Sequence, residues 1–149
     1  MMAPGRIGLR SQIVIDGVPV PIAFTFDRPE TMVTAATGAL LARVHDGRMT
    51  GDAREAKLEM GFQRPVRPLT VATPLMLGGL ELRDLIVRTV DTGSTASIPD
   101  AQQDLNEIVV TAGSKGKVVH GIFVGTASLA GCSTLTFDKP KAQIRLSCL

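Results

Sequence analysis

The sequence predicts a mostly β protein with one or two short helices, on three observations. Short runs rich in β-branched and apolar residues recur along the chain, and they are separated by turn-forming pairs such as Asp-Gly and Gly-Gly. Only one segment has a clear helical pattern of apolar residues. The length of 149 residues fits a single domain, 1–149, with a core of its own. That core has to be largely aliphatic, because the chain contains five Phe but no Trp or Tyr.

The first predicted element is a hairpin. Residues 13–15 and 18–22 are β-rich, and the Asp-Gly pair at 16–17 between them favours a tight turn. Prolines at alternate positions, Pro19 and Pro21, predict an edge strand or an irregular start to the strand that continues to residue 26.

The best helix candidate is residues 34–44. Thr34 is placed to cap its start, and Leu40, Leu41 and Val44 would share one face. Gly38, inside the segment, counts against a helix.

The middle of the chain predicts further strands. Residues 45–56 are polar and rich in Gly, which predicts an exposed loop or a mobile hairpin, and residues 57–60 return as a strand. Two prolines then precede a strand at 69–72. A hairpin is expected around Gly78-Gly79, followed by a strand at 85–90.

Residues 92–106 are polar and predict a loop, with a helical turn near Pro99 as one option. Residues 108–110 and 118–119 are strand candidates on either side of the Gly-rich stretch 113–116, which lacks the phosphate-loop pattern and predicts a hairpin turn.

The chain ends in a predicted hairpin, with alternating strands at 133–137 and 142–146 around a polar turn. Pairing across that turn would bring Cys132 opposite Cys148, within reach of a disulfide. Two independent thiols remain the alternative. A disulfide would favour a periplasmic or exported protein, and free thiols a cytoplasmic one.

Charge and hydropathy exclude several classes of function. The net charge is +2, and the 16 basic and 14 acidic residues are spread along the chain without a basic stripe, so we expect no nucleic-acid binding. No apolar run approaches the ~20 residues of a membrane helix, so no membrane insertion is expected. The start has no signal-peptide core, but a mature domain can be cut from a longer precursor, and the compartment stays open.

Four segments, taken in order, resemble bacterial single-domain retropepsin-like aspartic proteases. Residues 15–27 resemble the hairpin that leads to the catalytic aspartate, and residues 76–87 resemble the family's leucine-glycine-glycine hairpin. The sequence HGIFVG at 120–125 resembles the hydrophobic-Gly element that supports the catalytic turn, here Gly121, Ile122 and Phe123. Residues 135–146 match the closing hairpin.

The resemblance implies a retropepsin-like closed β structure, the single-lobe acid-protease fold. It also implies that an enzyme of this type is a homodimer, because one turn supplies one aspartate and the chemistry needs two that share a proton. It implies no cofactor or metal, and a peptide or protein as substrate or partner.

Asp27 stands at the position of the family's catalytic aspartate, but the two residues that follow it differ. Arg28 replaces a Thr or Ser whose hydroxyl joins the two turns of the dimer. Pro29 replaces a Gly whose N–H helps hold the carboxylate, and proline has no N–H. Arg28 would also hold a lone carboxylate ionised. The favoured hypothesis is therefore a pseudoenzyme that acts in binding or self-association, although two facing Arg28 side chains would repel. An active homodimeric aspartic endopeptidase, a hydrolase using Asp27, is the alternative.

A rival catalytic residue is Asp91, within the sequence VDTGST at 90–95. This matches the motif of an active aspartic protease and also follows an apolar strand. However, only about thirty residues separate it from the Gly121 element, too few for the expected flap and hairpins. Asp-Thr-Gly-Ser is also common in turns, so a loop is the alternative.

Other catalytic chemistry has little support in the sequence. The only histidines are His45 and His120, and the cysteines form no Cys-x-x-Cys pair, so no metal site is expected. Ser94 has no nucleophile-elbow pattern around it.

Overall fold

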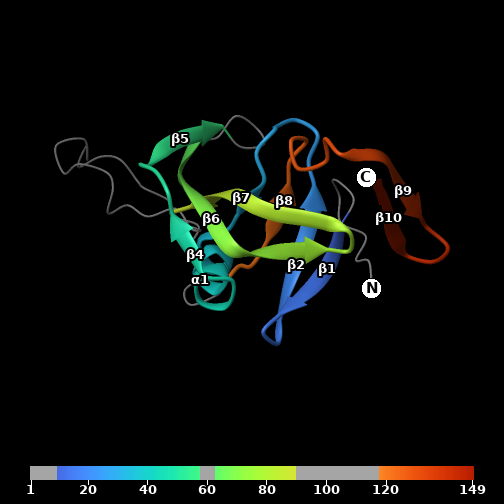
Figure 1. Ribbon diagram of the computed structural model, residues 1–149, viewed down its shortest axis with the longest axis horizontal. Coiled ribbons are helices and arrows are strands. Elements are labelled where there is room, and N and C mark those ends of the chain that lie inside the picture. The colour runs from blue at the N-terminus through green and yellow to red at the C-terminus, as the bar shows by residue number, and fades with distance from the viewer. Residues whose placement is uncertain (1–9, 58–62, 90–117) are drawn as a thin grey trace, which may run out of the picture.

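The computed structural model describes residues 10–57, 63–89 and 118–149, and in these ranges the chain forms ten strands and one helix (Figure 1). The helix is α1 (Ala35–Val44). The strands are β1 (Arg10–Ile15), β2 (Val18–Phe24), β3 (Met32–Val33), β4 (Gly47–Met49), β5 (Arg54–Lys57), β6 (Gln63–Leu77), β7 (Leu80–Arg88), β8 (Ile122–Val124), β9 (Cys132–Asp138) and β10 (Gln143–Cys148). The predicted all-β class with a short helix is confirmed.

Eight strands form one mixed sheet in the order β1-β2-β8-β3-β7-β6-β4, with β5 also paired to β6. Strand β8 lies between β2 and β3, parallel to β2 and antiparallel to β3. The chain that links β2 to β3 must therefore cross the carboxyl end of β8. This crossing carries Asp27, so the central three strands position the candidate site.

The β1–β2 hairpin forms as predicted. Asp16 and Gly17 both have positive φ, 48° and 76°, as a tight hairpin turn requires. Pro19 and Pro21 lie in the part of β2 that β8 does not reach, since β8 pairs only with residues 22–24. The Thr25 N–H donates to the Val124 carbonyl of β8. In a strand, the N–H groups of every second residue point to the same side, so positions 19 and 21 face the same side as Thr25. The missing N–H groups of both prolines therefore face that unpaired side, which agrees with the predicted edge.

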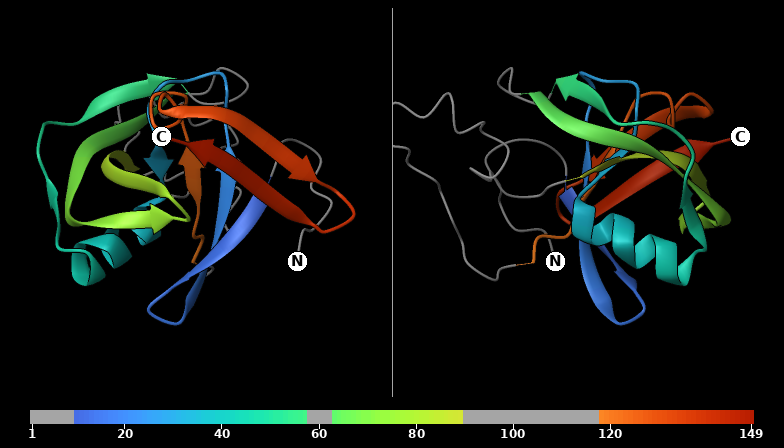
Figure 2. Two further views of the ribbon diagram at one scale, coloured as in Figure 1. Left: turned by 45° about the vertical axis from the view of Figure 1, so that its right-hand side comes forward. Right: turned by 90° about the vertical axis from the view of Figure 1, so that its left-hand side faces the viewer.

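Helix α1 packs on the sheet beside β4, β6 and β7 (Figure 2). Thr34 caps it as predicted, accepting the Thr37 N–H at 3.3 Å. Leu40 and Leu41 are buried, whereas Val44 is 38% exposed. Gly38 was read as unfavourable, but a Cβ there would lie 2.3 Å from the Val87 side chain. A glycine is needed because the helix lies directly on β7.

Three predictions for the chain after α1 need correction. Residues 45–56 contain β4 and most of β5, and the two prolines expected to precede a strand lie within the long β6. Pro68 is tolerated because its carbonyl accepts the Thr50 N–H, so its nitrogen faces the gap between β4 and β5. Residues 118–119 form no strand. The predictions for residues 92–106 and 108–110 lie outside the described residues.

The terminal hairpin is confirmed. Cys132 pairs with Cys148 in the β9–β10 ladder, and their sulfurs lie at disulfide distance, which agrees with the predicted disulfide. The hairpin is separate from the main sheet and lies at the β1–β2 side of the molecule, away from α1 (Figures 1 and 2). Its half-buried face packs against the main core through Leu135, Ile144 and Leu146.

Among the described residues, no helix has the length and apolar character needed to cross a membrane.

Candidate functional site

The segment that crosses β8, residues 25–31, is here called the Asp27 turn. Its backbone is hydrogen-bonded to the end of β8, to the residues that follow β8 and to β7. The N–H of Thr25 donates to the Val124 carbonyl at 2.9 Å, and at the other end the Thr31 carbonyl accepts the Ile86 N–H at 2.9 Å. Between them, the carbonyls of Arg28 and Pro29 accept the N–H groups of residues 126 and 127, each at 3.0 Å. The turn is thus held along its length.

Gly125 is the point of closest approach between the Asp27 turn and the end of β8. A Cβ at this position would lie 2.3 Å from the carbonyl oxygens of both Pro29 and Glu30. No side chain fits there, so the glycine is a requirement of the architecture. The sequence reasoning did not single it out, although two glycines four residues apart at 121 and 125 were a signal.

The predicted supporting residues lie elsewhere along β8. Gly121 precedes the strand, at the end remote from Asp27, where its N–H donates to the Thr37 hydroxyl at 3.0 Å and its carbonyl accepts the Thr34 N–H at 3.1 Å. Ile122 is buried at the centre of the sheet, and Phe123 packs beside Met32. These residues hold the sheet and the start of α1. The contacts from this part of the chain to the turn come from residues 124–128.

A partly buried pair of hydroxyl groups, also missed in the sequence, closes the turn. Thr31 is 2% exposed, and its Oγ1 lies 2.5 Å from the Ser128 Oγ. The same Thr31 oxygen accepts the Gly125 N–H at 3.0 Å. The end of the turn and the segment after β8 are therefore joined by side chains as well as by backbone.

The Asp27 carboxylate is exposed at the surface of the turn and accepts a hydrogen bond from the hydroxyl of the buried Thr25. The hydrogen bond from the Thr25 hydroxyl has the largest effect and lowers the pKa of Asp27 below its ordinary value of 3.8. Burial opposes this by a smaller amount, and the Asp27 backbone N–H and the charge of Arg28 each lower the pKa a little further. Asp27 is therefore a lone ionised carboxylate at neutral pH.

Arg28 turns inward. Its side chain is 8% exposed, and Nη1 donates to the thioether sulfur of Met32 at 3.4 Å. Its Nε is buried and has no hydrogen-bond partner. In the described part of the chain, no carboxylate lies within 4.0 Å of the Arg28 guanidinium, the distance that defines an ion pair. This includes the neighbouring carboxylate of Asp27.

Pro29 and Glu30 complete the turn. Pro29 has no N–H, so the turn offers the Asp27 carboxylate no donor at this position. Glu30 accepts from Arg54 at 2.9 Å, and this partly exposed ion pair links the turn to the start of β5. The β5–β6 hairpin and the Asp27 turn are thereby neighbours.

Asp91 lies outside the described residues, but the strand before it is informative. Strand β2 runs parallel to β8, with Ile22 opposite Ile122. In the same way, β7 runs parallel to β3, with Ile86 opposite Met32. The sheet is thus approximately two-fold about the β3–β8 pair. In the sequence, Asp91 comes as many residues after Ile86 as Asp27 comes after Ile22. Because β2 and β7 run in opposite directions, the carboxyl ends of these two strands lie at opposite ends of the sheet.

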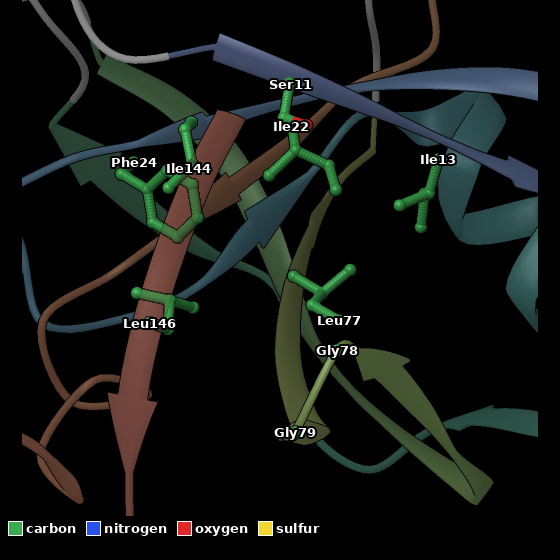
Figure 3. Close-up of a pocket in the computed structure, with 9 residues that line it drawn as sticks. All are labelled: Ser11, Ile13, Ile22, Phe24, Leu77, Gly78, Gly79, Ile144 and Leu146. Atoms are coloured by element: carbon green, nitrogen blue, oxygen red, sulfur yellow. The ribbon is translucent and has the colours of Figure 1, made fainter. Parts of the chain in front are cut away.

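A separate cavity of about 200 Å³ lies between β1, β2, the β6–β7 turn and β10 (Figure 3). Its lining is mostly aliphatic: Ser11, Ile13, Ile22, Phe24, Leu77, Gly78, Gly79, Ile144 and Leu146. None of these described residues is charged, so they supply no acid or base for catalysis.

The described residues bring together no group of three or more His, Cys, Asp or Glu side chains that could hold a metal ion. Comparison of the chain with family models, with curated proteins and with solved structures found no match.

Proposed function

We propose that this chain is a single-lobe retropepsin-like domain with a catalytically degenerate active-site turn, acting by binding a peptide or protein or by self-association. The order of the sheet supports the family assignment. An aspartate turn joins two strands across the end of a third, and the Gly-Gly hairpin, the Gly125 contact and the closing hairpin follow in the sequence order of that family.

The state of Asp27 and Arg28 carries the proposal of lost catalysis. An aspartic protease needs two carboxylates that share one proton, which requires one raised pKa. Here the Thr25 hydroxyl and the Arg28 charge lower the pKa of Asp27. Arg28 is buried against Met32 and offers no hydroxyl for a second turn, and Pro29 offers no N–H. The lowered pKa of Asp27, the missing hydroxyl at Arg28 and the missing N–H at Pro29 all oppose a state in which two carboxylates share one proton.

An active homodimeric endopeptidase using Asp27 remains the second candidate. One observation favours it: the carboxylate is exposed beside Phe26, which is 64% exposed, so a second copy has an apolar surface to bury next to Asp27. Asp91 remains a weaker candidate for the catalytic group.

Incubation with an unfolded protein substrate at pH 4 and at pH 7 tests the proposal. We expect no cleavage by the wild-type chain. Cleavage abolished by Asp27→Asn, but not by the matched surface variant Asp16→Asn, would establish the endopeptidase instead. Cleavage abolished by Asp91→Asn alone would move the catalytic residue to the second motif.

A restoration experiment asks whether the two altered residues cause the loss. We expect the double variant Arg28→Thr/Pro29→Gly to gain a cleavage activity that a third change, Asp27→Asn, removes. A folded double variant without activity would contradict the family assignment of the turn.

Sedimentation equilibrium of the wild-type protein measures self-association. We expect Phe26→Asp to weaken any self-association of the wild type.

A further inference from the structure

Among the described residues, no carboxylate lies within 4.0 Å, the distance of an ion pair, from the buried guanidinium of Arg28. It is 8% exposed, its Nε has no partner, and Nη1 meets only the weakly accepting sulfur of Met32. Arginine keeps its charge in proteins. Placing such a charge in an apolar environment is costly unless an anion accompanies it.

The side chain that the guanidinium contacts, Met32, belongs to an apolar group of residues from several strands. This small group, here called the Met32 cluster, is formed by Met32, Ala56, Val66, Ile86 and Phe123. These residues come from β3, β5, β6, β7 and β8. The low polarity of this cluster strengthens the attraction between Arg28 and an incoming anion.

The two acidic residues of the turn are each engaged by another donor. Asp27 accepts from the Thr25 hydroxyl, and Glu30 accepts from Arg54 at 2.9 Å. Neither lies within ion-pair distance of Arg28. Neither carboxylate of the Asp27 turn therefore forms an ion pair with the Arg28 guanidinium.

We propose that Arg28 is the receptor for a carboxylate group of an acidic peptide, which enters beside the Asp27 turn and pairs with the guanidinium. This rests on the proposed role of the turn in binding. The planar fork of Arg suits a carboxylate, which it holds with two parallel hydrogen bonds. The exposed ring of Phe26, two residues away, suits an apolar residue next to the acid in the peptide.

The nearby charge of Asp27 has a defined effect on this site. It is ionised at neutral pH and repels a second carboxylate. Removing it by Asp27→Asn is therefore expected to tighten binding, a result that a purely structural Arg28 does not produce.

The first measurement follows the Nε–Hε resonance of Arg28 by nitrogen-15 NMR of the full chain. Sodium acetate is added at constant ionic strength, with sodium chloride as the reference. We expect a saturable shift of the Arg28 resonance with acetate and none with chloride. No specific shift would overturn the proposal. A shift larger with inorganic phosphate than with acetate would also overturn the choice of a carboxylate.

The second measurement compares peptides and variants by calorimetry. Short peptides with an apolar residue beside a Glu, each with a free or an amidated C-terminus, separate a side-chain carboxylate from a terminal one. We expect Arg28→Met to weaken binding by about 30-fold or more, Arg28→Lys to weaken it less, and Asp27→Asn to strengthen it. Equal affinity of wild type and Arg28→Met would overturn the proposal.

The outcomes separate the two proposals. Cleavage that depends on Asp27 contradicts the pseudoenzyme, whether or not acetate shifts the Arg28 resonance. Absence of both cleavage and carboxylate binding leaves the degenerate turn in place and rejects the role of Arg28.

Discussion

The two ends of β8 both bury polar groups, but they satisfy them differently. Before the strand, the fully buried Thr37 hydroxyl accepts the Gly121 N–H, contacts the Thr34 hydroxyl at 3.0 Å and lies 3.3 Å from His120 Nδ1. After the strand, the Asp27 turn buries the Arg28 guanidinium with its Nε unpartnered. A satisfied network is expected of a structural joint, whereas an unsatisfied charge marks a place where something else can bind.

The largest difference between the two ends should come from glycine substitution. We expect Gly125→Ala to lower the free energy of unfolding by about 3 kcal/mol or more, because the added Cβ meets two backbone oxygens at 2.3 Å. Gly121→Ala is the matched control, since its Cβ would lie 3.5 Å from its nearest neighbours. Urea unfolding measures both, and equal losses would contradict the tight approach at the Asp27 turn.

The hydroxyl network at the start of β8 should give the next largest effect. Thr37→Val keeps the shape of the side chain but leaves the Gly121 N–H without its acceptor, and we expect a loss of about 2 kcal/mol. Thr126→Val is the comparison at the other end, where an exposed hydroxyl donates to the Arg28 carbonyl at 3.3 Å. Thermal unfolding should show little change for Thr126→Val. A larger loss there than at Thr37 would reverse the comparison.

Arg28→Met should change stability in the opposite direction. An apolar side chain of similar length replaces an unpaired charge beside the Met32 cluster, so we expect a gain of about 1–2 kcal/mol. Arg28→Ala controls for lost packing and should not show this gain. A marked loss of stability in Arg28→Met, measured by urea unfolding, would mean that the guanidinium is already compensated in the free protein.

The smallest expected effect is the pH dependence from Asp27. Its folded-state pKa lies below 3.8, so the stabilisation from the Thr25 hydroxyl is present above the unfolded-state pKa and is lost as the pH falls through the folded-state pKa. Because the carboxylate is exposed, we expect less than about 0.5 kcal/mol. The stability of wild type and Asp27→Asn should therefore converge between pH 5 and pH 2. Carbon-13 NMR of the carboxyl group should give a midpoint below 3.8, and a midpoint above it would remove the argument against a shared proton.

Local patterns were enough to predict the hairpins, the capped helix and the pairing of Cys132 with Cys148. Each of these depends on residues near one another in sequence, such as Asp16-Gly17 at a turn or Thr34 at a helix start. The interior position of Pro68 could not be predicted, because it depends on β4 and β5 leaving a gap along β6.

The candidate site was predicted only in part, for the same reason. Asp27, Arg28 and Pro29 were visible as a motif, but the sequence placed Arg28 beside the carboxylate. In the fold it turns instead toward Met32. Thr31, Gly125 and Ser128 act through contacts across more than ninety positions of the chain, which no local pattern shows.

The prolines of β2 also bear on how the protein behaves at high concentration. An exposed strand edge invites another chain to extend the sheet, and aggregation follows from that pairing. Beyond the reach of β8, β2 would offer its N–H groups at positions 19 and 21, and both are proline. An incoming strand finds no donors at these two positions, so the prolines themselves protect this part of β2 against templated growth.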